Sequence, residues 1–372
     1  MAIDGFDLER LLAPIEGENP AGIDPRTDYS ATSAYNRLRD ARSEARAAER
    51  AMDAAAEEAT MPPQWRTIRD LADKLLSGQA KDLEVAAWYT EALLRSNGFA
   101  GLGAGFRLMH GLVAGFWDGL YPMPDEDGMI TKVAPVTGLN GEGGDGALTQ
   151  PIRKVPLLRD LVGNPLSLWQ IEQADALESL EEARKEARIA AGALSLDGVM
   201  KAAAALPAPH WLAIAGALNE AIAAWGELSA ALDERAGADA PPTSAVRELL
   251  ATALATVTRL AGDKLAVAEE EAAGDEEAAT EGGEAPAGGG GARRGGRPGE
   301  IGSREDALKM LEEVARWFRR VEPHSPLSYT LEEAVRRGRM SLPDLLAELM
   351  PDESTRAGFL SSLGIRPPQA EE

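Results

Sequence analysis

The residue types of a hydrolytic site occur close together in the stretch "RRVEPHSPLSY", residues 319–329. Glu322, His324 and Ser325 could supply an acid, a base and a nucleophile. The two prolines argue against this use, because a proline pushes the residue before it into extended backbone, where adjacent side chains point in opposite directions. His324 and Ser325 then cannot readily hydrogen-bond to each other, as a nucleophile and its base must. We therefore predict a structural turn formed by Glu322, Pro323, His324, Ser325 and Pro326, with a hydrolase that uses Ser325 as the alternative.

The other candidates for chemistry are weaker. The three histidines, His110, His210 and His324, each stand alone in their segment, without the paired spacing of a metal site. The acidic loop "PDEDG", residues 124–128, could hold a divalent cation but lacks the twelve-residue ligand pattern of a calcium loop. The glycine-rich stretch 288–296 lacks the Gly-Lys-Ser/Thr ending of a phosphate-binding loop. The sequence therefore predicts no catalytic residue, no metal site and no cofactor.

The composition narrows the class of protein. The chain has 372 residues, which is room for two or three domains, and no cysteine, which excludes disulfides and thiolate sites and favours a reducing compartment. The formal net charge of −23 argues against a protein that grips phosphate backbones. The first 17 residues lack the pattern of a secretory signal. We expect a cytoplasmic protein that binds other proteins and no nucleic acid.

One apolar stretch, residues 98–120, has the length of a membrane span. It contains Arg107, His110 and Asp118, which a lipid-facing helix of that length would hardly tolerate. Glycines recur every four residues from 111 to 119, a spacing that lets a helix backbone approach a neighbour closely. We predict a buried helix and no direct membrane insertion.

Helical periodicity covers most of the chain, and no stretch alternates with period two for long enough to predict a strand. In residues 64–78 the apolar residues fall on one helical face: Trp65, Ile68, Leu71, Leu75 and Leu76. Asp82 stands in the N-cap position of the next helix, which should close at Asn97-Gly98. The predicted fold class is all-α.

Composition divides the chain into four parts. Residues 269–284 hold eight acidic residues and no basic one, and a glycine-rich stretch follows, so this segment cannot bury enough apolar surface to offset its ordering entropy. We therefore predict helical bundles joined by a disordered acidic, Gly-rich linker. The predicted parts are an N-terminal helical domain (1–158), an Ala-rich helical middle domain (159–265), the linker (266–302) and a small helical oligomerisation domain (303–372).

The helix predicted for residues 304–321 carries apolar residues over about half of its circumference, more than the ~100° stripe of an ordinary surface helix. A C-terminal part of this size cannot easily cover so wide a face, so the surplus is a candidate subunit interface. A single well-buried core helix would show the same periodicity, and the pattern does not decide between the two. The candidate interface residues are Met310, Leu311, Val314, Trp317, Phe318 and Val321.

Short motifs in the first part occur in a characteristic order: Pro20-Ala21-Gly22, Trp65, Lys81-Asp82-Leu83, Ala87-Trp88, Thr90-Glu91-Ala92-Leu93, Gly98-Phe99-Ala100-Gly101-Leu102, Trp117-Asp118, Tyr121-Pro122 and Leu139-Asn140. In this order and spacing they resemble the ImpA-type domain of TssA proteins of bacterial type VI secretion systems. The stretches "SREDALKMLEEVARWFRRVEPHSPLSY", "MSLPDLL" and "LGI" resemble the short-form TssA tail. Where that family commonly has Arg after the acidic loop, this chain has "GMITKV", so the role of Lys132 stays open.

This resemblance implies a cytoplasmic, non-enzymatic assembly factor. Members with such a tail form rings through the C-terminal domain and engage baseplate, tube, spike and contractile-sheath proteins. A homo-oligomer formed by the tail would give the wide apolar face of residues 304–321 a use. From the residues alone, the alternatives are a generic cytoplasmic helical adaptor and the hydrolase based on Ser325.

Overall fold

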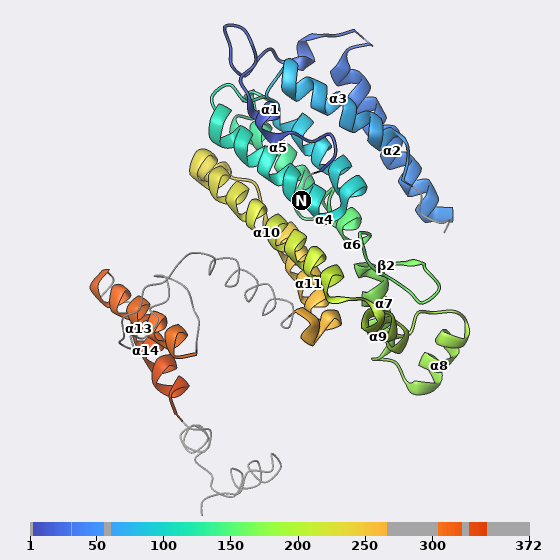
Figure 1. The fold of residues 1–372 in the computed structure, drawn as a ribbon. Coiled ribbons are helices and arrows are strands. Elements are labelled where there is room, and N and C mark those ends of the chain that lie inside the picture. The colour runs from blue at the N-terminus through green and yellow to red at the C-terminus, as the bar shows by residue number, and fades with distance from the viewer. Residues whose placement is uncertain (1–2, 31, 56–60, 266–303, 322–326, 341–372) are drawn as a thin grey trace, which may run out of the picture. The chain divides into compact units, whose positions relative to one another are not determined.

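The computed structural model of the chain describes residues 3–30, 32–55, 61–265, 304–321 and 327–340 (Figure 1). They belong to two compact units, which divide between residues 283 and 284. Both units are mostly helical, as predicted. The predicted linker, 266–302, lies outside the described residues.

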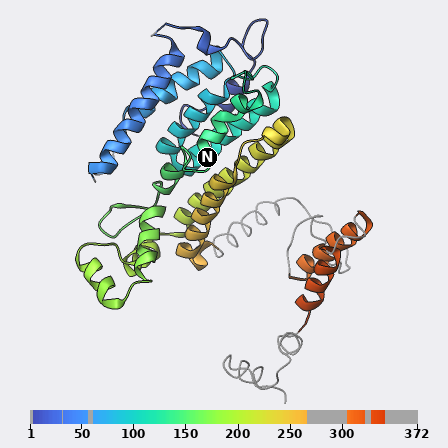
Figure 2. The ribbon, with the colours of Figure 1, turned by 180° about the vertical axis from the view of Figure 1, so that it is seen from behind.

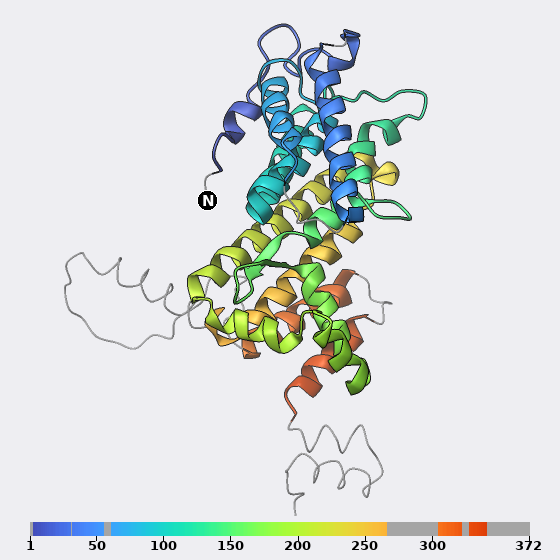
Figure 3. The same ribbon diagram turned by 90° about the vertical axis from the view of Figure 1, so that its right-hand side faces the viewer.

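The first unit is a stack of helices around one long helix. Its elements up to residue 140 are α1 (Leu8–Leu12), the 3-10 helix η1 (Pro25–Thr27), α2 (Ala34–Ala55), α3 (Gln64–Gly78), α4 (Leu83–Phe116) and α5 (Met129–Asn140). The later helices are α6 (Thr149–Arg153), α7 (Leu168–Leu177), α8 (Glu182–Ala190), α9 (Leu196–Ala205), α10 (Ala208–Ala236), η2 (Gly237–Asp239) and α11 (Ser244–Ala261). Helices α2 and α3 lie on one side of α4 and α10 on the other, with α11 packed on α10 (Figures 1 and 2). Helices α7, α8 and α9 extend from one end of this stack (Figure 3).

Helix α3 confirms the predicted apolar face. Its five predicted residues are all buried, and Trp65 and Ile68 have no exposed surface at all. The helix ends at Gly78, as predicted. A face of this kind stabilises a helix mainly through tertiary packing, here against α2 and α4.

Helix α4 reverses direction at Gly98, where the backbone takes φ 57° and ψ −142°. Only glycine adopts such a conformation without steric cost. The two limbs lie against each other, because the start of α4 meets the chain beyond its end: Leu83 N donates to Tyr121 O at 2.7 Å. The predicted break at Asn97-Gly98 and the predicted buried helix beyond it are therefore confirmed.

Among the described helices, α4 alone is long and apolar enough to be a candidate membrane span by length and composition. Most of its residues are buried among the other helices of the unit. The apolar residues of α4 therefore form part of the packed core of the first unit. The reversal at Gly98 divides the helix into two shorter limbs.

The structure contains a small β-hairpin that the sequence analysis did not predict. Strands β1 (Pro156–Arg159) and β2 (Pro165–Ser167) pair antiparallel. They are too short for a period-two pattern, and Leu157 and Leu158 are both buried, so polar and apolar residues do not alternate. The turn is held by the Asp160 carboxylate, which accepts hydrogen bonds from the backbone N–H groups of Val162 and Asn164 at 3.0 and 2.8 Å.

The first unit has one hydrophobic core, which runs from Leu11 to Ala261. Contacts cross the predicted boundary at 158/159: the rings of Phe106 and Trp225 lie 4.6 Å apart, and the Asn140 side chain accepts a hydrogen bond from Val246 N at 2.9 Å. That boundary is therefore not a break in the packing. The change in composition near residue 160 marks a change of helix type within a single core.

The second unit contains α13 (Arg304–Val321) and α14 (Leu327–Gly338). Ion pairs show that the two helices run antiparallel, because Arg319 pairs with Glu332 at 2.8 Å and Glu312 pairs with Arg339 at 3.6 Å. Ala315 is fully buried in this helical hairpin. Helix α13 has the bounds that the sequence predicts for it.

The contact between α4 and α10 can be tested with matched glycine substitutions. A Cβ atom at Gly103 would lie 3.3 Å from the backbone of Ala221 in α10, whereas one at Gly115 would meet no atom within 4 Å. We expect Gly103→Val to lower the free energy of unfolding by about 1–3 kcal/mol, since it overpacks the contact. Gly115→Val should change it by about 0.5 kcal/mol or less. Urea unfolding measures both, and equal effects would contradict a shared α4–α10 core.

Candidate functional site

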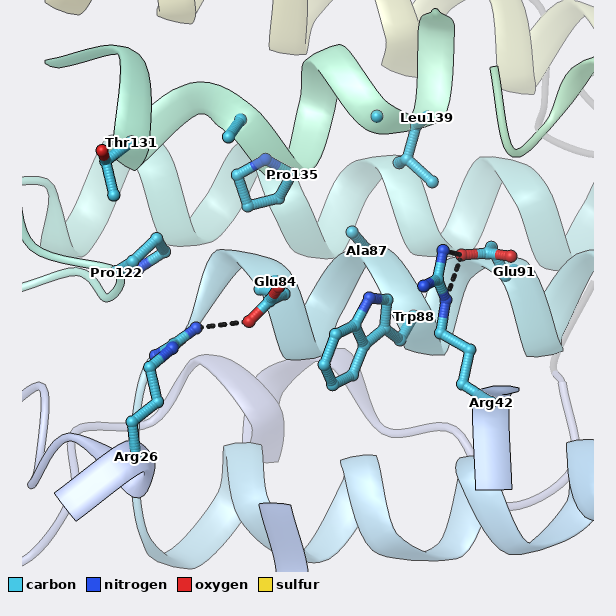
Figure 4. A pocket seen from close by; sticks show the side chains of 12 residues that line it. Arg26, Arg42, Glu84, Ala87, Trp88, Glu91, Pro122, Thr131, Pro135 and Leu139 are labelled. Carbon is cyan, nitrogen blue, oxygen red and sulfur yellow. Dashed lines mark hydrogen bonds and ion pairs between the residues drawn. The ribbon is translucent and has the colours of Figure 1, made fainter. Parts of the chain in front are cut away.

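A pocket of about 340 Å³ opens on the first unit between the N-terminal limb of α4, helix α5 and the chain around η1 and α2 (Figure 4). It is lined by Arg26, Arg42, Glu84, Ala87, Trp88, Glu91, Pro122, Thr131, Ala134, Pro135, Gly138 and Leu139. Several of these belong to the motifs that carry the family resemblance. We refer to it as the Trp88 pocket.

Arg26 and Glu84 form one edge of the Trp88 pocket, and the buried Asp82 pairs with the same arginine. Arg26 Nη1 lies 2.6 Å from Asp82 Oδ2, and Arg26 Nη2 lies 2.6 Å from Glu84 Oε2. The Tyr35 hydroxyl donates to the same Glu84 oxygen at 2.6 Å. Burial works against the charged guanidinium, but the Asp82 carboxylate outweighs it and raises the pKa of Arg26. Burial and the hydrogen bond to Glu84 raise the pKa of Tyr35, so its hydroxyl stays protonated and donates.

Asp82 is positioned by its role as the N-cap of α4. Its carboxylate accepts hydrogen bonds from the backbone N–H groups of Glu84 and Val85, both at 2.9 Å, as the sequence predicts for a cap residue. The side chain is fully buried. Burial raises the pKa of the Asp82 carboxyl, while Arg26 and the cap hydrogen bonds oppose that rise. Arg26 thus holds the start of α4 to the chain around η1.

A second charged cluster forms the other edge. Arg42 donates to Glu91 Oε1 through Nε at 2.8 Å and lies 2.6 Å from it through Nη2, and Glu91 is fully buried. Arg95 pairs with Glu49 at 2.6 and 2.9 Å, and its guanidinium lies 3.7 Å from the centre of the Trp65 ring. Glu91 Oε2 lies 3.9 Å from Arg95 Nη1 and has no hydrogen-bond partner within the described part of the chain. The network ties α2 to the N-terminal limb of α4.

Trp88 lies between the two clusters and, although it is only 7% exposed, contributes to the apolar surface of the pocket together with Ala87, Pro135 and Leu139. Its ring stacks on Tyr35 at 5.6 Å between centroids, and the Arg42 guanidinium lies 5.4 Å above it. Pro135 and Leu139 of α5 face it across the pocket (Figure 4). Each contact restrains the ring, so the apolar surface is formed before anything binds.

The lining suits binding better than bond cleavage. Its only hydroxyl belongs to Thr131, no His lines it, and both of its carboxylates are already paired with arginines. An apolar side chain of a bound segment would fit against Trp88. Polar atoms beside that side chain would meet the guanidinium edges of Arg26 and Arg42, which are 27% and 22% exposed.

Lys81, next to the cap residue, is a fully buried cation that joins two helix ends. Its Nζ donates to the carbonyl oxygens of Leu11 in α1 and Leu76 in α3, at 2.7 and 2.8 Å. A cation is favourable there, because carbonyl groups at helix C-termini carry partial negative charge. Burial lowers the pKa of Lys81 to about 8.

Lys132 of α5 occupies a similar environment. It is almost fully buried, its Nζ donates to Leu120 O at 2.8 Å, and it lies 5.1 Å from the centre of the Trp117 ring. Burial lowers its pKa, and Asp118 opposes that change. The side chain secures the segment that leads from α4 to α5. It does not line the Trp88 pocket.

Two of the remaining polar candidates, Asp125 and His210, have structural partners. The Asp125 carboxylate of the "PDEDG" loop accepts hydrogen bonds from Asp127 N and from the Thr131 hydroxyl, so it holds its own turn. His210 forms a 2.8 Å hydrogen bond with Leu157 O of β1. His110 of α4 is half-buried. Neither of these histidines lines the Trp88 pocket.

The predicted interface residues lie on α13, in the second unit. Leu311, Val314 and Trp317 are 37%, 39% and 49% exposed. Met310 and Phe318 are half-buried, and the Phe318 ring meets the Trp317 ring edge-on at 5.0 Å. Outside the described residues lie the side chain of Val321 and the predicted turn of Glu322, Pro323, His324, Ser325 and Pro326.

Sequence reasoning found Asp82 as a cap but missed its ion pair with Arg26, which is 56 residues away. It also missed the pairing of Glu91 with Arg42, 49 residues away. A weak signal was present: Glu91 sits within an apolar run, "TEALL", and a buried carboxylate requires a cation. Nothing local indicates which of the many arginines supplies it.

Comparisons with known proteins agree with this geometry. Residues 12–141 match the family model described as ImpA, N-terminal, type VI secretion system. The type VI secretion system component TssA1 of Pseudomonas aeruginosa strain PAO1 is 28% identical over 354 residues, which cover 93% of this chain and 96% of that protein. A solved N-terminal domain that includes the conserved ImpA_N region, from the TssA component of Burkholderia cenocepacia, matches with a TM-score of 0.58 at 25% identity. That match covers 71% of this chain and 99% of the solved chain.

The helical fold and the residues around the Trp88 pocket therefore define an ImpA-type N-terminal region. The matched share of this chain is larger than the predicted domain 1–158 would cover, in agreement with the single core of the first unit. The similarity to TssA1 extends over nearly the whole length of both proteins, so the chain resembles a TssA component throughout and carries the ImpA-type region at residues 12–141.

The Arg42–Glu91 pair can be tested with two substitutions in the same helix. Arg42→Gln leaves the buried Glu91 carboxylate without its closest cation, so we expect the free energy of unfolding to fall by about 2–4 kcal/mol. Arg39→Gln removes an exposed arginine that lies 3.5 Å from Asp40 and should cost about 0.5 kcal/mol or less. Urea unfolding measures the free energy of unfolding of both variants. A loss of stability confined to Arg39→Gln would contradict the assignment of Arg42 as the partner of Glu91.

Replacing Lys81 should give a loss of stability that depends on pH. Lys81→Met leaves two buried carbonyl groups without a donor, at a cost of about 1–3 kcal/mol near neutral pH. The pKa of Lys81 is about 8 in the folded chain and 10.5 in a free lysine, so the unfolded chain binds more protons between these values. The stability of the wild type should therefore rise relative to Lys81→Met as pH increases through that window.

Denaturant unfolding at about neutral pH and at about pH 10 measures this difference. Lys74→Met, at an exposed position of α3, serves as the control and should change the free energy of unfolding by about 0.5 kcal/mol or less. A Lys81→Met effect that shrinks at high pH would contradict the direction of the pKa change.

Proposed function

We propose that this chain is a non-enzymatic scaffold that helps to assemble a bacterial type VI secretion system in the cytoplasm. The observation that carries this proposal is the similarity to the TssA1 component across 93% of this chain and 96% of that protein. A match of that extent includes the region of the second unit as well as the ImpA-type region. The first unit then supplies binding surfaces, and the second supplies self-association.

Self-association through α13 is supported by its exposed apolar side chains. Trp317 is about half exposed, and Leu311 and Val314 are also exposed on the same helix. Water-exposed aromatic and aliphatic groups that gather on one helix favour burial against another subunit. We propose that copies of the second unit close into a ring, in which the contact repeats around an axis. Met310, Phe318 and Val321 complete the proposed interface.

The Trp88 pocket supports a role of the first unit in binding partners. It combines a restrained aromatic surface with two arginine edges, a composition enriched at the centres of protein interfaces. Its proposed partners are baseplate, sheath, tube and spike proteins of the secretion system. Neither nucleic acid nor direct membrane insertion forms part of the proposal.

We further propose that residues 266–302, which the sequence predicts to be a linker, join one first unit to each copy of the second unit. A ring of second units would then carry several first units on tethers of similar length. Weak contacts of the individual pockets would combine through effective concentration, so that a partner with repeated subunits binds more tightly than any single contact allows.

Two substitutions in the full chain test the assembly surface. Trp317→Asp places a charge in the proposed interface, so we expect the mass in solution to fall from a large defined oligomer toward the monomer of 39.4 kDa. Arg316→Asp alters a neighbouring exposed position of α13 outside the predicted interface and should leave the oligomer intact. Light scattering coupled to size exclusion measures both.

A monomeric wild type would exclude the ring. An oligomer that resists Trp317→Asp would move the interface to another surface of the chain. Co-purification from a cell with an active secretion system separates this function from a generic adaptor, which should not recover baseplate or sheath subunits.

A further inference from the structure

A second groove, of about 610 Å³, lies on the first unit and shares no lining residue with the Trp88 pocket. It is bounded by the C-terminal half of α2, by the chain just before the α4 reversal and by the segment around α6. Lys154, at the end of α6, pairs with Asp53 of α2 at 2.5 Å and closes one side. Apolar side chains, among them Met61, Leu94 and Val155, form much of its surface.

The carboxylates that line this groove are all engaged by neighbouring side chains. Glu49 is held by Arg95 through two hydrogen bonds, at 2.6 and 2.9 Å. Asp53 pairs with Lys154, and Asp145 accepts a hydrogen bond from Gln150 at 3.2 Å. Glu49 and Asp53 are therefore paired with cations, whereas Asp145 keeps its charge. Among the described lining residues, four cations (Arg46, Arg50, Arg95 and Lys154) stand against three carboxylates.

Two arginines of α2 line the same groove, and within the described part of the chain neither forms a hydrogen bond or a close ion pair. Arg46 is half-buried and Arg50 is exposed. Burial lowers the pKa of Arg46; Glu91 opposes that change, and the nearby Arg42 and Arg95 add to it. A guanidinium that is partly dehydrated and surrounded by other guanidiniums gains strongly from a carboxylate partner.

The positive charge of the groove is opposite in sign to the net charge of the chain. With a formal net charge of −23, the protein as a whole repels acidic molecules. At this groove an excess of positive charge borders an apolar surface. An inorganic anion would use only the arginines, whereas a peptide with acidic and apolar side chains would use both parts of the lining.

We propose that this groove binds a short acidic and apolar segment of a partner protein. A carboxylate of that segment pairs with Arg46 and Arg50, and an adjacent apolar side chain packs against Leu94 and Val155. The proposal does not rest on the secretion function, because it concerns a different surface and follows from the chemistry of the groove alone.

The test uses the full chain and a short fluorescein-labelled peptide composed of Asp, Glu, Leu and Phe. Fluorescence anisotropy should show binding to the wild type and affinity about tenfold weaker for Arg46→Gln, which removes a charge-assisted hydrogen bond. Arg39→Gln, on the same helix but outside the groove, should bind as the wild type does. The same peptide with Gln and Asn in place of Glu and Asp should also bind about tenfold more weakly.

Thermal unfolding separates this role from a structural one. Because Arg46 forms no hydrogen bond or close ion pair within the described residues, Arg46→Gln should lower the melting temperature much less than Arg42→Gln does, while it loses affinity. Unchanged affinity in Arg46→Gln, or equal binding of the neutral peptide, overturns the proposal. Binding that appears only after the carboxylates of residues 269–284 are replaced by amides would assign the groove to this chain's own acidic tract and would overturn the external partner.

Discussion

The reversal of α4 at Gly98 is the constraint on which the first unit depends. It converts one apolar segment into two limbs that pack on each other, with Thr90 of the first limb against Met109 of the second. The first limb then carries Trp88 and Glu91 toward α2 and α5, while the second presents Phe106 and Gly103 to α10. Because a residue with a Cβ is strained at φ 57°, a single glycine allows one core to serve both sides.

Buried charges fix how the helices meet the α4 hairpin. Lys81 and Asp82 are adjacent, and both are fully buried, but they serve opposite ends of helices. The lysine donates to the carbonyl groups that end α1 and α3, whereas the aspartate accepts from the amide groups that begin α4. Each charge therefore meets backbone dipoles of the opposite sign, which offsets the cost of burying it. Two neighbouring residues thus set the relative positions of three helices.

The surfaces that remain open have different chemistry. The Trp88 pocket presents an aromatic ring between arginines that are already paired, so it is electrically balanced. Within the described part of the chain, the groove beside α6 keeps two guanidiniums without a hydrogen bond or close ion pair, and α13 exposes the apolar side chains of Leu311, Val314 and Trp317. Three surfaces of such different character suit the proposed scaffold role, because each favours a different kind of partner. Ion pairs join the two helices of the second unit, and Leu311, Val314 and Trp317 of α13 stay exposed, as the proposed subunit interface requires.

Local sequence determined the helical class, the apolar face of α3, the Asp82 cap and the break at Gly98, because periodicity, capping and backbone conformation depend on residues a few positions apart. The tertiary structure alone decided which arginine meets each buried carboxylate, since Arg26 lies 56 residues from Asp82 and many arginines compete locally. It also joined the two predicted helical domains into one core and placed the short β-hairpin beside His210. Those outcomes depend on contacts between distant segments, whose energies exist only once the helices have packed.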